Sequence, residues 1–269
     1  MAQFAAFAQH RFAGLTGAAG THEGGSMKAL PLLALLMFGA NVRAETAAIS
    51  ADQLADKMAA AVEDGDSTAR VRMKTSGGNI LQVQIKSRRS GGRAVTVYEI
   101  LWPAERKGEK VILRQSKGSA PEGETVSASG ARAKVSGAQV GEGVFGTDLS
   151  YADAIENFFL WPDQKIGGEE KVGKVGCVIL DSRPSGPSPH GKVRSWIDPE
   201  KSVVHRVEKY DKSGRLLRTI ATTQVAKDDT GRNVPAGLTV SRPGSSSTEI
   251  DGSNIRHDVK LTDADLAVP

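Results

Sequence analysis

Cysteine is almost absent from this sequence, which excludes one way of holding a fold together. Cys177 is the single cysteine among 269 residues, so the chain cannot close an internal disulfide. The apolar run 175–180 around it is typical of a strand, and a buried thiol explains Cys177 better than a reactive one. The fold therefore depends on its core.

A strong excess of either charge is also missing. Lysine and arginine total 35 against 31 acidic residues, a formal net charge of +4, and removing residues 1–44 lowers it to about +2. So mild a basic balance gives no support for binding nucleic acid. After residues 29–40, no apolar run is long enough for a membrane-spanning helix.

Motifs that would carry catalysis or bind a metal are missing too. The sequence has no Gly-x-Ser-x-Gly motif, and His190, His205 and His257 are not spaced as metal ligands. Segment 141–146 matches the dinucleotide fingerprint in its letters, but its neighbours are predicted hairpins rather than a βαβ unit. We therefore predict no catalytic residue, no cofactor, no metal and a protein that is not an enzyme.

What the sequence does contain begins with an export signal. Met27-Lys28 precedes the apolar run 29–40, and Val42-Arg43-Ala44 resembles a signal-peptidase site. We predict a cleavable signal peptide over 27–44 and an unstructured upstream extension over 1–26, for which a genuine N-terminal tail is the alternative. Residues 45–269 are long enough for one β-rich domain.

Local patterns predict one helix and then a series of strands. Ser50 and Gln53 form a capping box before a helix to Val62, with an apolar stripe at every fourth residue. Alternating segments joined by tight turns follow, which indicates antiparallel pairing. Residues 171–182 are expected as one strand, and 247–250 and 255–261 as two. Gly118–Gly130 is expected to be a mobile loop or a ragged strand.

One predicted strand, 93–102, is apolar on both sides, so both faces must be covered or must line something apolar. The fold class predicted from these elements is mainly β (α+β). We expect a single curved antiparallel sheet of about ten or eleven strands that forms an incomplete barrel. Short helices are expected to cover its open side.

The central segment Gly143–Asp153 contains a second helix start. Ser150 and Asp153 form a capping box. The helix behind them is aromatic-rich, reaches Trp161 and must stop at Pro162. We expect it to lie against the concave side of the sheet. Gly146, Asp148, Ser150 and Asp153 are predicted to be structural, with Asp148 forming hydrogen bonds at the helix entry.

A barrel left open on one side can enclose more volume than its side chains fill. Such a space suits an acyl chain, whose burial yields about 0.8 kcal/mol per methylene. Ordinary core packing is the alternative role for each large residue expected to face it. The residues predicted to contact a hydrophobic ligand are Tyr98, Ile100, Trp102, Phe145, Phe158, Phe159, Trp161 and Trp196.

The motif Phe145-Gly146-Thr147-Asp148-Leu149-Ser150-Tyr151, followed by Asp153, resembles the signature of the outer-membrane lipoprotein-sorting proteins, the LolA/LolB-like superfamily. Trp196-Ile197-Asp198 and the turn from Lys209 to Gly214 are similar to the same branch. The resemblance covers 45–269 and implies a half-barrel with a helical lid over an apolar cavity. The sequence departs from the lipoprotein chaperone in its Pro/Ser loop 183–189 and its few aromatics, and the lid-locking arginine is assigned to no particular position.

The resemblance implies a periplasmic carrier that binds lipid, lipoprotein acyl chains or another hydrophobe and passes it between envelope components toward the outer membrane. Its expected partners are lipid, and an RND-type exporter or an outer-membrane acceptor; no nucleic acid is expected, and the chain is expected to be monomeric. The alternative is a non-carrier accessory module that docks on an exporter or envelope complex. An esterase acting on envelope lipids is a third hypothesis.

Overall fold

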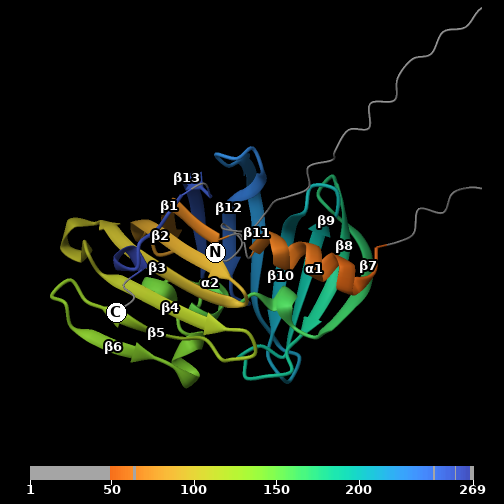
Figure 1. Ribbon diagram of the computed structural model, residues 1–269, viewed down its shortest axis with the longest axis horizontal. Helices are drawn as coiled ribbons and strands as arrows, with labels where there is room; N and C mark the ends of the chain where they lie inside the picture. Colours follow the sequence, from red (N-terminus) through yellow and green to blue (C-terminus); the bar gives the residue numbers. More distant parts are fainter. Residues whose placement is uncertain (1–48, 63–64, 245, 258, 267–269) are drawn as a thin grey trace, which may run out of the picture. The chain divides into compact units, whose positions relative to one another are not determined.

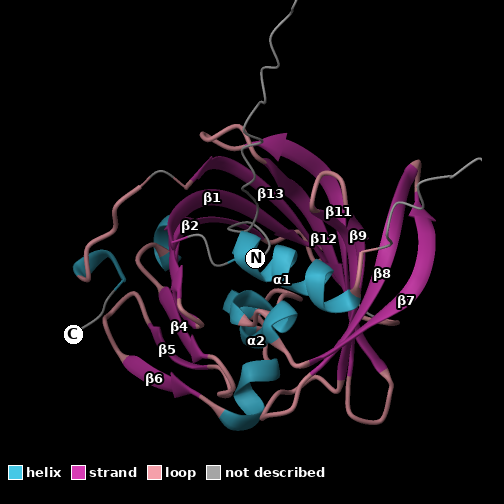
Figure 2. Cartoon of the chain, turned by 45° about the vertical axis from the view of Figure 1, so that its right-hand side comes forward, coloured by secondary structure: helices cyan, strands magenta, loops and turns pink. Residues whose placement is uncertain are grey.

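The computed structural model describes residues 49–62, 65–244, 246–257 and 259–266, so the predicted extension 1–26 and signal peptide 27–44 lie outside the described residues. Within this described part, thirteen strands form one antiparallel sheet. The sheet is open, and it curves around the helices α1 and α2 (Figure 1, Figure 2). No helix in the described ranges has the length and apolar character needed to cross a membrane.

The strands follow the chain as β1 (Gly65–Thr75), β2 (Ile80–Ser90), β3 (Arg93–Trp102), β4 (Lys110–Ser116), β5 (Glu122–Val126), β6 (Arg132–Val135), β7 (Asp163–Val172), β8 (Val175–Arg183), β9 (Lys192–Asp198), β10 (Val203–Tyr210), β11 (Leu216–Lys227), β12 (Asn233–Ser241) and β13 (Ser247–Arg256). The helices are α1 (Ala51–Val62) and α2 (Tyr151–Ile155), with short 3₁₀ turns η1 (Ala104–Arg106), η2 (Gly137–Gly141), η3 (Val144–Gly146), η4 (Phe158–Leu160) and η5 (Ala264–Leu266).

The path of the chain explains why a helix lies inside the sheet. The first strand, β1, pairs with the last, β13, in the middle of the sheet, and the order runs from β6 at one edge to β7 at the other. Strands β1 to β6 step outward to one edge, and β7 to β13 return from the opposite edge. The connection 136–162 must therefore cross from edge to edge, and it carries α2 across the concave side (Figure 2).

The predicted strand count was too low. No strand was predicted over 163–170, and the expected single strand 171–182 contains the last two residues of β7 and then β8, because Gly173, with φ 61°, turns β7 into β8. The segment 118–130, expected to be a mobile loop or a ragged strand, contains the short strand β5, which pairs with β4 and β6. In the opposite direction, the two strands expected over 247–261 are one strand, β13, which ends at Arg256.

Helix α1 agrees with the sequence prediction. The Ser50 Oγ accepts a hydrogen bond from the Gln53 backbone N–H at 3.2 Å, and the Gln53 side-chain oxygen accepts from the Ser50 N–H at 3.0 Å. Leu54, Met58 and Val62 are buried, as their four-residue spacing predicts. Helix α2 is shorter than predicted, because Glu156 and Asn157 leave the helical conformation and η4 follows as a separate turn.

Strand β3 is covered on both faces, as its two apolar sides predict. Tyr98 and Ile100 are fully buried on the concave side. On the other side Val97 packs with Ile112 and Leu266, the last belonging to the short C-terminal turn η5. The end of the chain thus shields a stretch of sheet that would otherwise expose apolar surface to water.

Candidate functional site

The candidate site is the concave face together with the crossing segment that covers it. Side chains from the sheet hold the end of α2. The Tyr98 hydroxyl donates to the Ala154 carbonyl at 3.0 Å, and Arg89 Nη1 donates to the Ile155 carbonyl at 3.0 Å. Both carbonyls belong to the last turn of the helix, which has no intrahelical donors for them. Strands β2 and β3 therefore fix α2 by its own backbone.

A buried ionic cluster, made of Asp153, Glu156, His190, Lys209 and Arg218, holds the other side of α2. Asp153 lies 2.9 Å from Lys209 Nζ, 3.2 Å from Arg218 Nε and 3.4 Å from His190 Nε2. His190 Nδ1 contacts a Glu156 carboxylate oxygen at 2.7 Å. The cluster joins α2 to β10, β11 and the loop after β8. Its members are all buried.

The charges in this cluster stabilise one another. Burial alone raises the pKa of Asp153, but Lys209, His190 and Arg218 outweigh it and hold that pKa well below its ordinary value. Burial and Lys209 lower the pKa of His190, whereas its hydrogen bonds to Asp153 and Glu156 raise it, and the net pKa is raised. The two neighbouring carboxylates thus favour the protonated form of the buried imidazole. The charged atoms of the cluster are paired with one another rather than directed at a ligand. We therefore interpret the cluster as a clamp, a set of contacts that holds α2 in place.

The structure corrects the role expected for Asp148. Its carboxylate does not serve the helix entry; it accepts from the hydroxyls of Ser246 and Thr248, each at 2.8 Å, and lies 3.4 Å from Arg242 Nε. Asp148 thus ties the crossing segment to the start of β13. The Ser150–Asp153 capping box is present as predicted, with Ser150 Oγ accepting from the Asp153 N–H at 3.1 Å.

Gly146 has φ 81°, and the preceding Phe145 has φ 53°. Two successive residues in the left-handed region turn the chain sharply just before α2. Glycine adopts this conformation without cost, which explains its place in the motif. Phe145 adopts it with strain, since a bulky side chain rarely has positive φ.

The structure places the predicted ligand residues in different surroundings. Tyr98, Ile100, Phe158 and Phe159 are buried on the concave side, with the two phenylalanine ring centroids 4.4 Å apart. Trp161 lies on the wall of a cavity at the rim. Their contact with a ligand stays a prediction.

The other three predicted ligand residues lie elsewhere. Trp102 is 48% exposed. The Arg106 guanidinium carbon lies over the Phe145 ring, 5.9 Å from the ring centroid. Trp196 is on the face of the sheet opposite to Lys209, where its Nε1 donates to Glu170 at 2.9 Å and its ring packs with Cys177. The eight residues therefore do not gather around one cavity. For Trp102 the cause is the register shift between β2 and β3, which pairs Ile100 with Val83 and Trp102 with Gln82 and so puts Trp102 on the face opposite to Ile100.

The helices and the crossing segment bury apolar side chains, of which Leu54, Met58, Leu149 and Ile155 are fully buried. A cavity of about 310 Å³ lies between Arg89, the turn η4 and the segments 115–119 and 184–187. We call it the rim cavity. Its volume is at the lower end of the range of about 300–1,000 Å³ that small-molecule pockets occupy.

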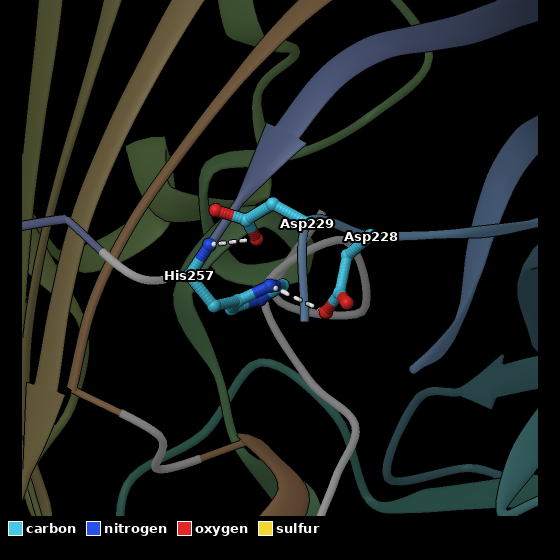
Figure 3. Close-up of side chains that lie close together, drawn as sticks. All are labelled: Asp228, Asp229 and His257. Carbon is cyan, nitrogen blue, oxygen red and sulfur yellow. Dashed lines mark hydrogen bonds and ion pairs between the residues drawn. The ribbon is translucent and has the colours of Figure 1, made fainter. Parts of the chain in front are cut away.

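Asp228, Asp229 and His257 also come together, with candidate ligand atoms within 4.8 Å of one another (Figure 3). Asp228 already accepts from Arg232 Nε at 2.7 Å and from the Thr230 hydroxyl at 2.8 Å, and its carboxylate lies 2.9 Å from His257 Nδ1. Burial raises the pKa of Asp228, but Arg232 and the turn donors lower it overall. These contacts hold the β11–β12 turn against the end of β13. The Arg232 guanidinium occupies the place beside Asp228 that a bound cation would take.

Sequence reasoning missed the ionic cluster around Asp153. Lys209 carried a signal: it shares a strand face with Val207, so a lysine on that apolar side required a buried partner. His190 and Arg218 carried none, because they lie far from Asp153 in the sequence. Arg89 carried the same kind of signal as Lys209, because it shares the buried strand face of Val83 and Ile85, but only folding brings it to α2.

Known structures share this arrangement. The chain is similar to a DUF1329 family protein from Desulfovibrio piger, with 25% identity, a TM-score of 0.73, and coverage of 80% of this chain and 94% of that chain. It shares the fold of a protein domain named for outer-membrane lipoprotein sorting from Vibrio parahaemolyticus, with 18% identity, a TM-score of 0.69, and coverage of 75% and 89%. It also shares the fold of the LolA superfamily protein NE2245 from Nitrosomonas europaea, with 16% identity, a TM-score of 0.64, and coverage of 81% and 97%.

These likenesses confirm the resemblance found in the sequence: the fold is that of the LolA-like lipoprotein-sorting proteins. Residues 95–267 match a family described as "Uncharacterized protein", and the chain belongs to that family. A comparison with curated proteins found no match.

Proposed function

We propose that this protein is a periplasmic carrier that binds lipid, lipoprotein acyl chains or another hydrophobe and passes it between envelope components, toward the outer membrane. The observation that carries the proposal is the cover over the concave face. It consists of α1 and the crossing segment 136–162, which contact the sheet by packing and side-chain bonds rather than by strand pairing. Moving such a cover exposes apolar surface without breaking the ladder of the sheet.

The structure favours α1 and η4 as the part that moves. Helix α1 packs on η4 and β7, and Lys57 Nζ donates to the Pro199 carbonyl at 2.7 Å. Helix α2, in contrast, is held by the buried ionic cluster, and separating such charges without new partners costs about 3–5 kcal/mol. An acyl chain that enters beside α1 gains hydrophobic burial and leaves the clamp intact.

The related proteins of known structure include one named for lipoprotein sorting and one of the LolA superfamily, which supports a carrier without covalent chemistry. We propose export by the signal peptide 27–44, a monomeric state, and an RND-type exporter or outer-membrane acceptor as the partner.

Native mass spectrometry of protein purified from the periplasm tests the proposal, together with titration of a fluorescent fatty acid. We expect co-purified lipid and saturable uptake. The variant Trp102→Ala changes an exposed side chain and should bind as the wild type does. A mass without bound lipid, together with no uptake of the fluorescent fatty acid, would contradict the carrier hypothesis. Capture of an envelope protein without lipid would then favour the accessory module.

A further inference from the structure

We infer that the rim cavity holds the polar end of an anionic amphiphile, and that the side-chain amide of Asn157 is a recognition group for it. The inference rests on the proposed function and adds which end of the ligand is recognised and where. Asn157 lines the cavity between α2 and η4 and is 9% exposed. Both of its amide atoms are buried and have no hydrogen-bond partner among the residues that the structure describes.

An unpartnered buried amide is costly to the fold. Buried side-chain polar atoms almost always find a partner, and leaving one without a partner destabilises the native state. The nearby glutamine shows the usual outcome, because Gln164 Nε2 donates to the carbonyls of Phe158 and Trp161. Asn157 lacks such bonds although it stands next to the same turn. A ligand in the rim cavity is in place to supply them.

The charge of the cavity wall selects the kind of polar group. Arg89 and Lys117 contribute positive charge, and the described residues lining the cavity include no carboxylate. Leu160, Trp161 and Pro162 supply apolar surface to the same space. A wall that carries cations, an amide donor and apolar groups fits an anionic head joined to a hydrocarbon body.

Two of the segments that line the cavity come from opposite halves of the sheet, one from the β1–β6 half and one from the β7–β13 half. Residues 115–119 are the end of β4 and the turn after it, and the loop 184–187 follows β8. They approach so closely that a Cβ added to Gly186 would stand 3.0 Å from the Gly118 carbonyl oxygen. With a volume of about 310 Å³, the cavity accommodates a head group and the first part of a chain. A longer tail must pass beneath η4 toward the concave face.

The test compares amphiphiles that share one tail: dodecanoate and dodecyltrimethylammonium, each titrated below its micelle concentration. We expect the wild type to bind dodecanoate at least about tenfold more tightly than the cation, because the wall carries cations and a donor. Asn157→Leu should weaken dodecanoate binding about tenfold and leave the cation within about twofold. Its melting temperature should equal or exceed that of the wild type, since it removes an unpartnered buried amide.

Two further variants keep the outcome decisive. Asn233→Leu makes the same change at the start of β12, away from the cavity, and should bind as the wild type does. Lys117→Glu reverses an exposed charge on the cavity wall and should weaken dodecanoate binding even if Asn157→Leu fails to fold. Quenching of Trp161 by a brominated fatty acid, in a chain with Trp102→Phe and Trp196→Phe, should report the ligand beside η4.

Unchanged dodecanoate binding in both Asn157→Leu and Lys117→Glu, or equal wild-type affinity for the two head groups, would overturn the inference while leaving the carrier in place. A wild type that binds neither amphiphile would overturn the carrier and the inference together.

Discussion

At the scale of single residues, Asp153 does more than cap a helix. One of its oxygens receives the Ser150 backbone N–H at 3.0 Å, and the same carboxylate meets Lys209 and Arg218. Buried charge clusters of this kind contribute little net stability compared with apolar packing, but they are severely destabilised when one member is removed. They are therefore well suited to fixing the position of α2 while neighbouring parts move.

The raised pKa of the buried His190 side chain predicts how stability depends on pH. Its pKa is raised above the ordinary 6.5, so its contribution is fully present below about pH 6.5 and is lost as the pH rises through the folded-state pKa. Urea unfolding across this range should show the free energy of unfolding falling toward alkaline pH. His190→Asn should cost roughly 3–5 kcal/mol near pH 6 and should flatten that fall.

The matched control is His205, whose pKa is lowered by burial. His205→Asn should leave the alkaline decline in place, because a group with a lowered pKa does not contribute stability that disappears as the pH rises. A His190→Asn profile parallel to that of the wild type would show that the imidazole is not charged in the folded protein. On the acid side, the lowered pKa of Asp153 means that its contribution is present above about pH 3.8 and is lost as the pH falls through its folded-state pKa.

At the scale of elements, the two capping boxes have the same chemistry and different surroundings. Ser50 caps α1 at the surface, whereas Ser150 is fully buried beneath the sheet. Water can replace the lost hydroxyl at an exposed cap but not at a buried one. The buried cap should therefore matter more, although α2 is much the shorter helix.

We expect Ser150→Ala to lower the free energy of unfolding by about 2 kcal/mol and Ser50→Ala by about 0.5 kcal/mol, the two ends of the range for such caps. Urea unfolding of the two variants provides the measurement. Ser150→Thr keeps the oxygen and should recover part of the loss. Equal losses at the two sites would mean that burial adds nothing to the cap.

At the scale of the whole sheet, the β1–β13 pair joins two halves and leaves two open edges. The edge strand β7 has exposed charged side chains, namely Lys165, Glu169 and Lys171. Its pairing with β8 is also irregular, because the register shifts between Ile166 and Gly168. Charged side chains and bulges on an edge prevent pairing with a second chain. These features agree with the monomer that we propose.

Replacing Lys165, Glu169 and Lys171 together by valine should convert the monomer into dimers and larger species, measured by size-exclusion chromatography with light scattering. The inner-strand variant Arg72→Val with Asp251→Val also removes exposed charges, but from strands whose backbone groups are already paired. It should remain monomeric. A monomeric β7 variant would show that the edge needs no charge to stay unpaired.

The fold was predictable where the signal is local. The capping boxes at Ser50 and Ser150 and the two-sided apolar pattern of 93–102 involve residues a few positions apart, and each is present. The count of strands was less predictable, because β7 is mostly polar and exposed and lacks the alternation of apolar residues that marks a strand. The role of Asp148 was mistaken because its partners Ser246 and Thr248 lie about a hundred residues away.

By itself, then, the sequence determined the class of fold, since alternation and helix caps are encoded within short stretches of chain. Only the tertiary structure decided the pairing of β1 with β13, the passage of 136–162 across the concave side, and the meeting of Asp153 with His190, Lys209 and Arg218. The reason is physical. A buried charge or amide is stable or strained according to what surrounds it in space, and those surroundings form only when the sheet curves and brings distant strands together.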